Sequence, residues 1–277
     1  MTLRAIELAP GITIGGKAPA AFPVIAGPCV IESAATTLGV AESLAGIAGR
    51  LGLKLLFKAS FDKANRSSGK AFRGPGLVEG LAVLAEVRRQ FALPLLTDVH
   101  EPAQCAPAAE VVDVLQIPAF LCRQTDLLLA AAATGKAVNV KKGQFMAPDD
   151  MRRVVDKIRT AGNDKVTVTE RGASFGYHNL VVDMRSFAWM QSDGIPVIYD
   201  VTHSLQLPGA GTDGTAGARE FAEPLARAAV AAGADGLFLE VHPDPEHALS
   251  DKDTQLPPDR AEALLASLLR VRAAIAG

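Results

Sequence analysis

The feature that most constrains the fold of this chain is a pattern that repeats eight times after a short N-terminal segment. Each repeat has a run of about five apolar, β-prone residues, then a polar loop, then a stretch with the apolar period of a helix. The predicted strands are Pro23–Ala26, Leu53–Lys58, Leu93–Thr97, Val112–Ile117, Ala137–Lys141, Lys165–Thr169, Pro196–Asp200 and Gly236–Glu240. The predicted helices lie near Thr37–Leu51, Leu77–Phe91, Pro102–Glu110, Gln124–Thr134, Pro148–Ala161, Asn179–Ser192, Ala218–Ala232 and Pro258–Ala276.

Eight βα units in about 250 residues, without a linker between them, are typical of a (β/α)8 TIM barrel. A doubly wound sheet usually has a G-x-G-x-x-G turn after its first strand, and this chain has A-G-P-C-V-I-E-S there. We therefore predict an α/β fold with one (β/α)8 barrel domain over residues 1–277. Residues 1–20 are expected to form an N-terminal extension, with a small hairpin around Pro10–Gly11.

The composition excludes several other classes of protein. A net charge of −2 argues against general nucleic-acid binding, and no apolar run reaches the ~18 residues of a membrane span. The N-terminus lacks the long apolar region of a secretory signal. Cys29, Cys105 and Cys122 are widely spaced and odd in number, which fits a reducing cytoplasm better than a disulfide framework.

Cations gather in the segments that follow the predicted strands, which is where a barrel carries its working residues. The densest cluster lies in Leu55–Gly76, and the full set is Lys58, Lys63, Arg66, Arg123, Lys141 and Arg171. Converging cations in a low-dielectric barrel mouth need anions to neutralise them, such as two phosphates or a phosphate and a carboxylate. Alternatives remain: a solvated basic loop, a salt-bridged strand end at Lys141-Lys142, or Lys141 as a Schiff-base nucleophile.

A second group combines a thiol, an imidazole and two carboxylates: Cys29, His203, Glu240 and Asp251. In a closed barrel the eighth strand neighbours both the seventh and the first, so these four residues could meet. Such a mixed donor set suits Zn²⁺, Fe²⁺, Mn²⁺ or Co²⁺. The alternative is structural, because a buried cysteine usually acts as a small hydrophobe and His203 could be a hydrogen-bonded core histidine.

Several long segments resemble one enzyme family, 3-deoxy-D-manno-octulosonate 8-phosphate synthase, also called 2-dehydro-3-deoxyphosphooctonate aldolase. They are F-K-A-S-F-D-K-A-N-R-S-S (57–68), F-R-G-P-G (72–76), Q-I-P-A-F-L-C-R-Q-T-D-L-L (116–128), N-V-K-K-G-Q-F (139–145), T-E-R-G-x-x-F-G-Y (169–177), Y-D-V-T-H-S-x-Q-L-P-G (199–209) and E-V-H-P-D-P-E-H-A-L-S-D (240–251). The related 3-deoxy-D-arabino-heptulosonate 7-phosphate synthase usually carries K-P-R-T-S where this chain has K-A-N-R-S-S. The resemblance therefore favours the synthase of the eight-carbon sugar.

The resemblance implies condensation of phosphoenolpyruvate with D-arabinose 5-phosphate and water, a step toward the lipopolysaccharide inner core. It assigns Lys58, Lys63, Gln116, Arg123, Lys141 and Arg171 to phosphoenolpyruvate, and Asn65, Arg66 and Ser67 to the pentose phosphate. It also implies a cytoplasmic homotetramer in which residues near Phe120 and Arg123 reach a neighbouring subunit's site. Cys29 stands where the metal-dependent branch has Cys and the metal-independent branch has Asn.

The expected chemistry follows from the implied substrates. The enol carbon of phosphoenolpyruvate is already nucleophilic, so no lysine imine is required. We expect Lys63 to protonate the developing alkoxide, Asp98 to orient a water or a hydroxyl, and an ion on Cys29 and His203 to position water or the aldehyde oxygen. Residues 208–217 are expected to form either a mobile lid or a plain surface loop. Two other functions remain open: condensation with erythrose 4-phosphate, and a non-catalytic barrel that binds sugar phosphates.

Overall fold

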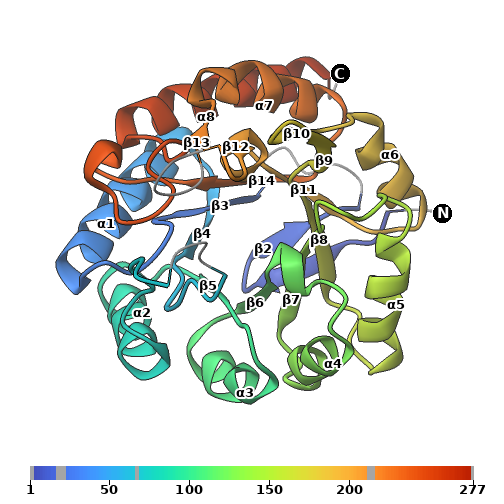
Figure 1. The fold of residues 1–277 in the computed structure, drawn as a ribbon, viewed down its shortest axis with the longest axis horizontal. Coiled ribbons are helices and arrows are strands. Elements are labelled where there is room, and N and C mark those ends of the chain that lie inside the picture. Colours follow the sequence, from blue (N-terminus) through green and yellow to red (C-terminus); the bar gives the residue numbers. More distant parts are fainter. Residues whose placement is uncertain (1–2, 17–22, 66–68, 211–215, 276–277) are drawn as a thin grey trace.

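The computed structural model describes residues 3–16, 23–65, 69–210 and 216–275. Eight parallel strands form a closed barrel in the order β11-β14-β3-β4-β5-β6-β7-β8, enclosed by a ring of helices (Figure 1). The barrel strands are β3 (Pro23–Gly27), β4 (Lys54–Lys58), β5 (Leu95–Asp98), β6 (Val114–Ile117), β7 (Ala137–Lys141), β8 (Val166–Glu170), β11 (Val197–Asp200) and β14 (Gly236–Glu240). The surrounding helices are α1 (Ala34–Leu51), α2 (Leu77–Phe91), α3 (Pro102–Val111), α4 (Thr125–Ala133), α5 (Met151–Thr160), α6 (Arg185–Ser192), α7 (Ala222–Ala231) and α8 (Pro258–Ile275).

The ring closes where the last barrel strand pairs with the first. Strand β14 is parallel to β3, with Glu240 opposite Gly27, and it is parallel to β11 on its other side. The prediction of a (β/α)8 barrel is confirmed. No helix in the part of the chain that the structure describes is long and apolar enough to span a membrane.

The prediction of a helix over Asn179–Ser192 is wrong in its first half. Residues 173–181 form an antiparallel hairpin of β9 (Ala173–Gly176) and β10 (Asn179–Val181), and the helix begins only at Arg185. Tyr177 and His178 have φ values of 52° and 62°, a left-handed conformation that forms the hairpin turn and cannot continue a helix. The helix predicted from Ala218 likewise begins at Ala222, after a single 3₁₀ turn.

The N-terminal hairpin closes one end of the barrel. Strands β1 (Ile6–Ala9) and β2 (Ile12–Ile14) pair antiparallel around Pro10–Gly11, as predicted, and β2 is seen through the ring in Figure 1. Their apolar side chains pack in one cluster with one residue from each of seven barrel strands: Ile25, Leu56, Leu96, Val114, Ala137, Ile198 and Phe238. Because this end of the barrel is filled with apolar side chains, polar chemistry is confined to the other end.

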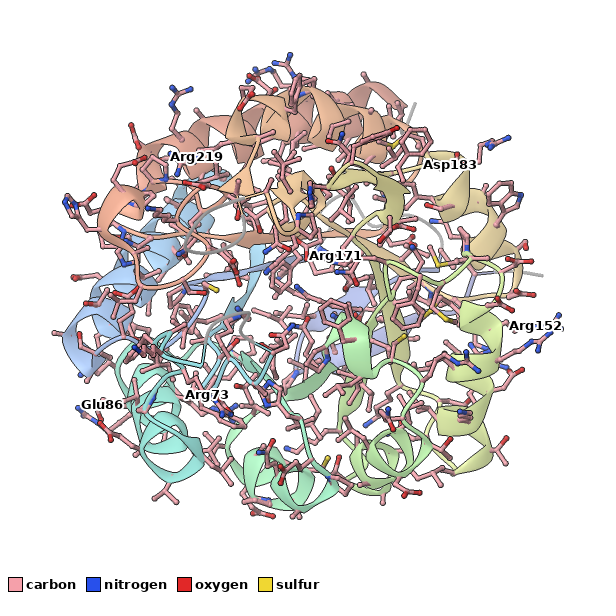
Figure 2. The ribbon with its side chains drawn as sticks, viewed as in Figure 1. Arg73, Glu86, Arg152, Arg171, Asp183 and Arg219 are labelled. Carbon is pink, nitrogen blue, oxygen red and sulfur yellow. The ribbon has the colours of Figure 1, made fainter. Side chains whose placement is uncertain are left out.

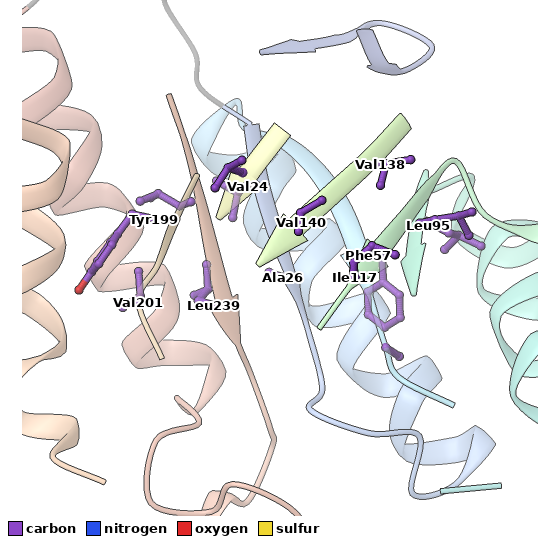
Figure 3. Close-up of a cluster of buried hydrophobic side chains, with 14 of the residues drawn as sticks. Val24, Ala26, Phe57, Leu95, Ile117, Val138, Val140, Tyr199, Val201 and Leu239 are labelled. Atoms are coloured by element: carbon purple, nitrogen blue, oxygen red, sulfur yellow. The ribbon is translucent and has the colours of Figure 1, made fainter. Parts of the chain in front are cut away.

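The larger core lies between the strands and the helices. The barrel residues in the cluster with the hairpin form an apolar inner layer. Their neighbours in sequence, such as Val24, Phe57 and Val138, face outward and pack with helix residues (Figure 3). This alternation is the period of two expected of a strand. It explains why most strand positions are apolar on both faces, as in other parallel sheets.

Two residues beyond the apolar inner layer, the inward positions become polar. Leu56 is followed by Lys58, Leu96 by Asp98, and Phe238 by Glu240. The buried polar residues at this level are Lys58, Asp98, Gln116, Asn139, Asp200 and Glu240, each at most 6% exposed, and Lys141 follows two residues beyond Asn139 on β7. The carboxyl ends of the strands therefore present a buried polar layer.

Candidate active site at the carboxyl end of the barrel

Four residues predicted as metal ligands lie together at this end of the barrel. Ligand atoms of Cys29, Glu240 and Asp251 all lie within 4.8 Å of one another. His203 Nε2 lies 3.4 Å from Glu240 Oε1 and 3.8 Å from Asp251 Oδ2. Cys29 follows β3, His203 lies in a 3₁₀ turn after β11, Glu240 ends β14, and Asp251 lies in the next loop. Closure of the ring is what brings the first of these residues to the last.

The donor atoms of this cluster fit a divalent transition ion. Glu240 Oε2 is buried and accepts no hydrogen bond from any residue that the structure describes. The Cys29 sulfur lies 3.1 Å from Asp251 Oδ2 and 2.8 Å from Ser250 Oγ. Burial, and then the charges of Asp251 and Glu240, raise the pKa of the Cys29 thiol well above its ordinary value. A cation among these groups would relieve that repulsion and favour the thiolate.

The imidazole of His203 is held by a buried carboxylate. Asp200 Oδ2 lies 2.9 Å and Oδ1 3.1 Å from Nδ1 of the ring, and Oδ1 also accepts the backbone N–H of His203 at 2.9 Å. The ring edge with Nε2 is thereby directed toward Glu240 and Asp251. Asp200 was not predicted as a site residue, although its place two residues after the inward Ile198 marks it as inward-facing.

Lys58 connects two of the candidate ligands. Its ammonium group donates to Glu240 Oε1 at 2.6 Å, to the Cys29 carbonyl at 2.8 Å and to the Pro28 carbonyl at 3.4 Å. These contacts take all three donors of the ammonium group, and the side chain is 1% exposed. In this arrangement Lys58 stabilises the strand ends that carry Cys29 and Glu240.

Lys63 lies closer to the opening of the barrel, with its nitrogen 3.8 Å from Glu240 Oε1. Its side chain is 15% exposed. Burial alone would lower the pKa of Lys63, but its electrostatic interactions with Cys29, Glu240, Asp98 and Asp251 together raise it above its ordinary value. Lys63 therefore keeps its proton at neutral pH.

Two further cations differ in how their charge is balanced. Lys141 is paired with Asp200 at 2.7 Å and lies 3.7 Å from the centre of the Phe238 ring. Burial lowers the pKa of Lys141, against the opposing effect of Asp200. Arg171, which lies over the interior of the ring in Figure 2, donates from Nη2 to the neutral amide of Gln206. Its Nη1 is buried without a hydrogen-bond partner among the described residues, so Arg171 can bind an anion.

Asp98 belongs to a polar network in the barrel interior. It accepts hydrogen bonds from Ser60 and from Gln116, the latter at 2.6 Å, and Gln116 in turn accepts from Asn139 at 2.8 Å. Burial would raise the pKa of Asp98, but Lys58, Lys63 and Lys141 outweigh it and hold the pKa well below its usual range. Asp98 is thus a fixed carboxylate beside Lys63.

Other predicted residues do not join this group. The side chains of Asn65 and Arg123 are exposed, and Arg66 and Ser67 lie outside the described residues. Within the predicted lid, residues 211–215 also lie outside them, while its edges pair as β12 (Gln206–Leu207) and β13 (Ala216–Gly217). Lys142 lies away from the barrel mouth with Glu170 at 3.3 Å, which is the salt-bridged arrangement considered for this lysine.

Two glutamines that were not predicted support the ligand cluster. Gln255 accepts the backbone N–H of Cys29 at 3.1 Å, and Gln206 donates to Asp251 Oδ1 at 3.1 Å. Gln206 lies in the segment 199–209 that carries the family resemblance, but neither glutamine was identified as a site residue, because a glutamine in a loop is usually exposed. Only the approach of distant loops makes them part of the site.

Comparison with known proteins adds independent information. A model of the DAHP synthetase I family matches residues 4–275. The chain is 57% identical to a protein of Geobacter sp. (strain M21) over 265 residues, which cover 96% of each chain. It is 58% identical over 265 residues to a protein of Pelobacter propionicus, covering 96% of this chain and 97% of the relative. A protein of Rhodopseudomonas palustris (strain BisB5) is 60% identical over 259 residues, which cover 93% and 90%. Each of these relatives is named 2-dehydro-3-deoxyphosphooctonate aldolase.

Proposed function

We infer from these comparisons that the chain, which belongs to the DAHP synthetase I family, is a 3-deoxy-D-manno-octulosonate 8-phosphate synthase. This transferase condenses phosphoenolpyruvate with D-arabinose 5-phosphate and water and releases phosphate. The observation that carries this conclusion is the identity of 57–60% to relatives of that name, over nearly the whole length of both chains. We further propose that the product enters lipopolysaccharide synthesis in the cytoplasm.

The cations at the barrel mouth support the binding of a substrate with two anionic groups. Asp200 and Glu240 already balance Lys141 and Lys58, so fewer free positive charges remain than the sequence alone suggests. Arg171 has an unpaired donor among the described residues, and Lys63 is partly open to solvent. We propose that these two bind the phosphate and the carboxylate of phosphoenolpyruvate, with Lys141 beside them.

The reaction assigns different roles to Lys63 and Asp98. Carbon 3 of the enol attacks the aldehyde of the sugar, so an alkoxide forms at the aldehyde oxygen while positive charge develops at carbon 2, where water adds. Lys63 remains an ammonium ion and can deliver a proton to that alkoxide. Asp98 remains a carboxylate and can accept a hydrogen bond from the attacking water or from a sugar hydroxyl. Fixed placement of both reactants supplies several kcal/mol of the acceleration.

We propose that Cys29, His203, Glu240 and Asp251 hold a divalent transition ion. The unpaired Glu240 Oε2 and the mixed sulfur, nitrogen and oxygen donors support it. When bound, such an ion supplies a Lewis acid in the barrel mouth. Neighbouring side chains hold the orientation of two of the ligands, since Lys58 donates to Glu240 and Gln206 donates to Asp251.

We also propose that the protein forms a homotetramer. Phe120 is 54% exposed and Arg123 is exposed next to it, on the segment that follows β6. This position supports a role in a neighbouring subunit's site and not in its own. In sedimentation experiments the protein should migrate as a tetramer. Arg123→Ala should raise the KM for phosphoenolpyruvate more than that for the sugar phosphate.

Phosphate release from phosphoenolpyruvate tests the function directly. Turnover should require D-arabinose 5-phosphate, stop on thorough chelation, and return with Zn²⁺, Fe²⁺, Mn²⁺ or Co²⁺, which also identifies the effective ions. Arg171→Lys should weaken phosphoenolpyruvate binding, whereas Arg152→Lys, on the outer face of α5 (Figure 2), should not. Faster turnover with erythrose 4-phosphate would instead identify a 7-phosphate synthase. Ligand binding without phosphate release would identify a non-catalytic barrel.

A further inference from the structure

We propose that Asp200 is a positioning residue that keeps a proton on Nδ1 of His203 and so presents Nε2 of the ring to a metal ion. The inference rests on the proposed metal site. Asp200 ends β11, is fully buried, and lies three residues before His203. Its carboxylate is the acceptor nearest to the ring, with both oxygens within 3.1 Å of Nδ1.

The Asp200 carboxylate and the Lys141 ammonium group both lie within hydrogen-bond distance of Nδ1, and the geometry shows which of them is its partner. Lys141 Nζ lies 3.2 Å from Nδ1, and a bond from Lys141 would require Nδ1 to carry a lone pair. That lone pair would then face both oxygens of the Asp200 carboxylate, which is repulsive. Lys141 Nζ is also nearer to Asp200 Oδ2, at 2.7 Å. The structure therefore favours an N–H group at Nδ1 that donates to Asp200.

The other ring nitrogen faces the ligand cluster. Nε2 has Glu240 Oε1 at 3.4 Å and Asp251 Oδ2 at 3.8 Å. Coordination requires a lone pair on Nε2, so the proton that the ring retains on binding must be the one on Nδ1. A carboxylate behind a metal-binding histidine fixes the ring's tautomer and orientation and raises its basicity.

Asp200→Asn tests this role directly, because both carboxylate oxygens of Asp200 accept hydrogen bonds that an amide cannot accept together. Oδ1 accepts from the His203 backbone N–H at 2.9 Å, and Oδ2 accepts from Lys141. In Asp200→Asn, the NH₂ group must replace one of these oxygens, so a donor faces a donor in either orientation. Loss of a carboxylate in this position typically weakens metal affinity about 10- to 100-fold.

A matched control is available at the opposite end of the barrel, just before the neighbouring strand β14. Asp235 is also buried, at 9% exposure, and accepts from the Val197 backbone N–H at 2.8 Å and from Gln191 at 2.9 Å. It precedes β14 and belongs to the closed end of the barrel. Asp235→Asn removes a buried carboxylate in the same way, so it reports the general cost to folding without touching His203.

The experiment measures the affinity of the substrate-free protein for Co²⁺ or Zn²⁺ by competition with a coloured chelator. Asp200→Asn should bind about 10- to 100-fold more weakly than wild type, and Asp235→Asn should bind as wild type does. If wild type binds neither ion, the metal site and this inference fail together. If wild type binds and Asp200→Asn binds equally well, only the inference fails.

A second measurement does not depend on the folding of the variant. In the Zn²⁺-loaded wild-type protein, ¹⁵N NMR of the imidazoles, with His203 assigned by comparison with His203→Gln, should show a proton on Nδ1 and none on Nε2. A ring without a proton on Nδ1, or one coordinated through Nδ1, would overturn the proposal.

Discussion

Replacement of Lys58 by Met tests how far the buried charges of the site depend on one another. Lys58 and Glu240 are 1% and 0% exposed and lie 2.6 Å apart. At an effective dielectric constant of about 20, their attraction is about 6 kcal/mol. Removal of one partner leaves a buried charge uncompensated, which typically destabilises a protein by about 3–5 kcal/mol.

The expected shift in melting temperature follows from the length of the chain. An unfolding entropy of about 2.1 cal/mol/K per residue gives about 0.6 kcal/mol/K for 277 residues. Lys58→Met should therefore lower the Tm by about 5–9 °C, measured by calorimetry in excess chelator. A divalent ion should then raise the Tm of Lys58→Met more than that of wild type, because the ion supplies the counter-charge that Glu240 has lost.

Lys142→Met is the matched control for this experiment. Lys142 is equally buried and lies 3.3 Å from Glu170, but it lies outside the barrel mouth. It should lose stability on a similar scale and gain no more from the metal ion than wild type does. A Tm of Lys58→Met within about 1 °C of wild type in chelator would refute the reasoning that Glu240 depends on Lys58 for its charge balance.

Three further predictions concern packing, covalent chemistry and pH. Gly27→Ala should lower the free energy of unfolding by about 1–3 kcal/mol, measured in urea, because an added Cβ would lie 1.9 Å from the Lys58 carbonyl oxygen. Gly39→Ala should not lower it, because nothing lies within 4 Å of the Cβ added there. Borohydride added with the substrates should trap no adduct at Lys141, and mass spectrometry that finds one would favour the imine mechanism. The folded-state pKa of Asp98 is lowered, so its contribution is complete above about pH 4 and is lost as the pH falls further. Acid unfolding of Asp98→Asn should accordingly be less steep, and an unchanged profile would contradict this.

Much of the architecture could be predicted because the period of apolar residues is a local property. Eight short apolar runs separated by helical stretches predict the barrel, and barrel closure implies that Cys29 can approach Glu240. The hairpin after β8 was missed for a local reason as well. Its turn depends on Tyr177 and His178 in a left-handed conformation, which is uncommon for residues other than glycine.

Sequence alone determined which strand ends carry chemistry, because strand periodicity and barrel topology send those residues to one face. Only the tertiary structure decided how their charges combine. Lys58 pairs with Glu240 and Lys141 with Asp200, whereas Arg171 keeps a free donor among the described residues. The physical reason is that side-chain periodicity can be read from a few neighbouring residues in the sequence. An ion pair instead requires two charges within about 4 Å of each other in space. Such proximity between residues 182 positions apart in the chain exists only once the ring has closed.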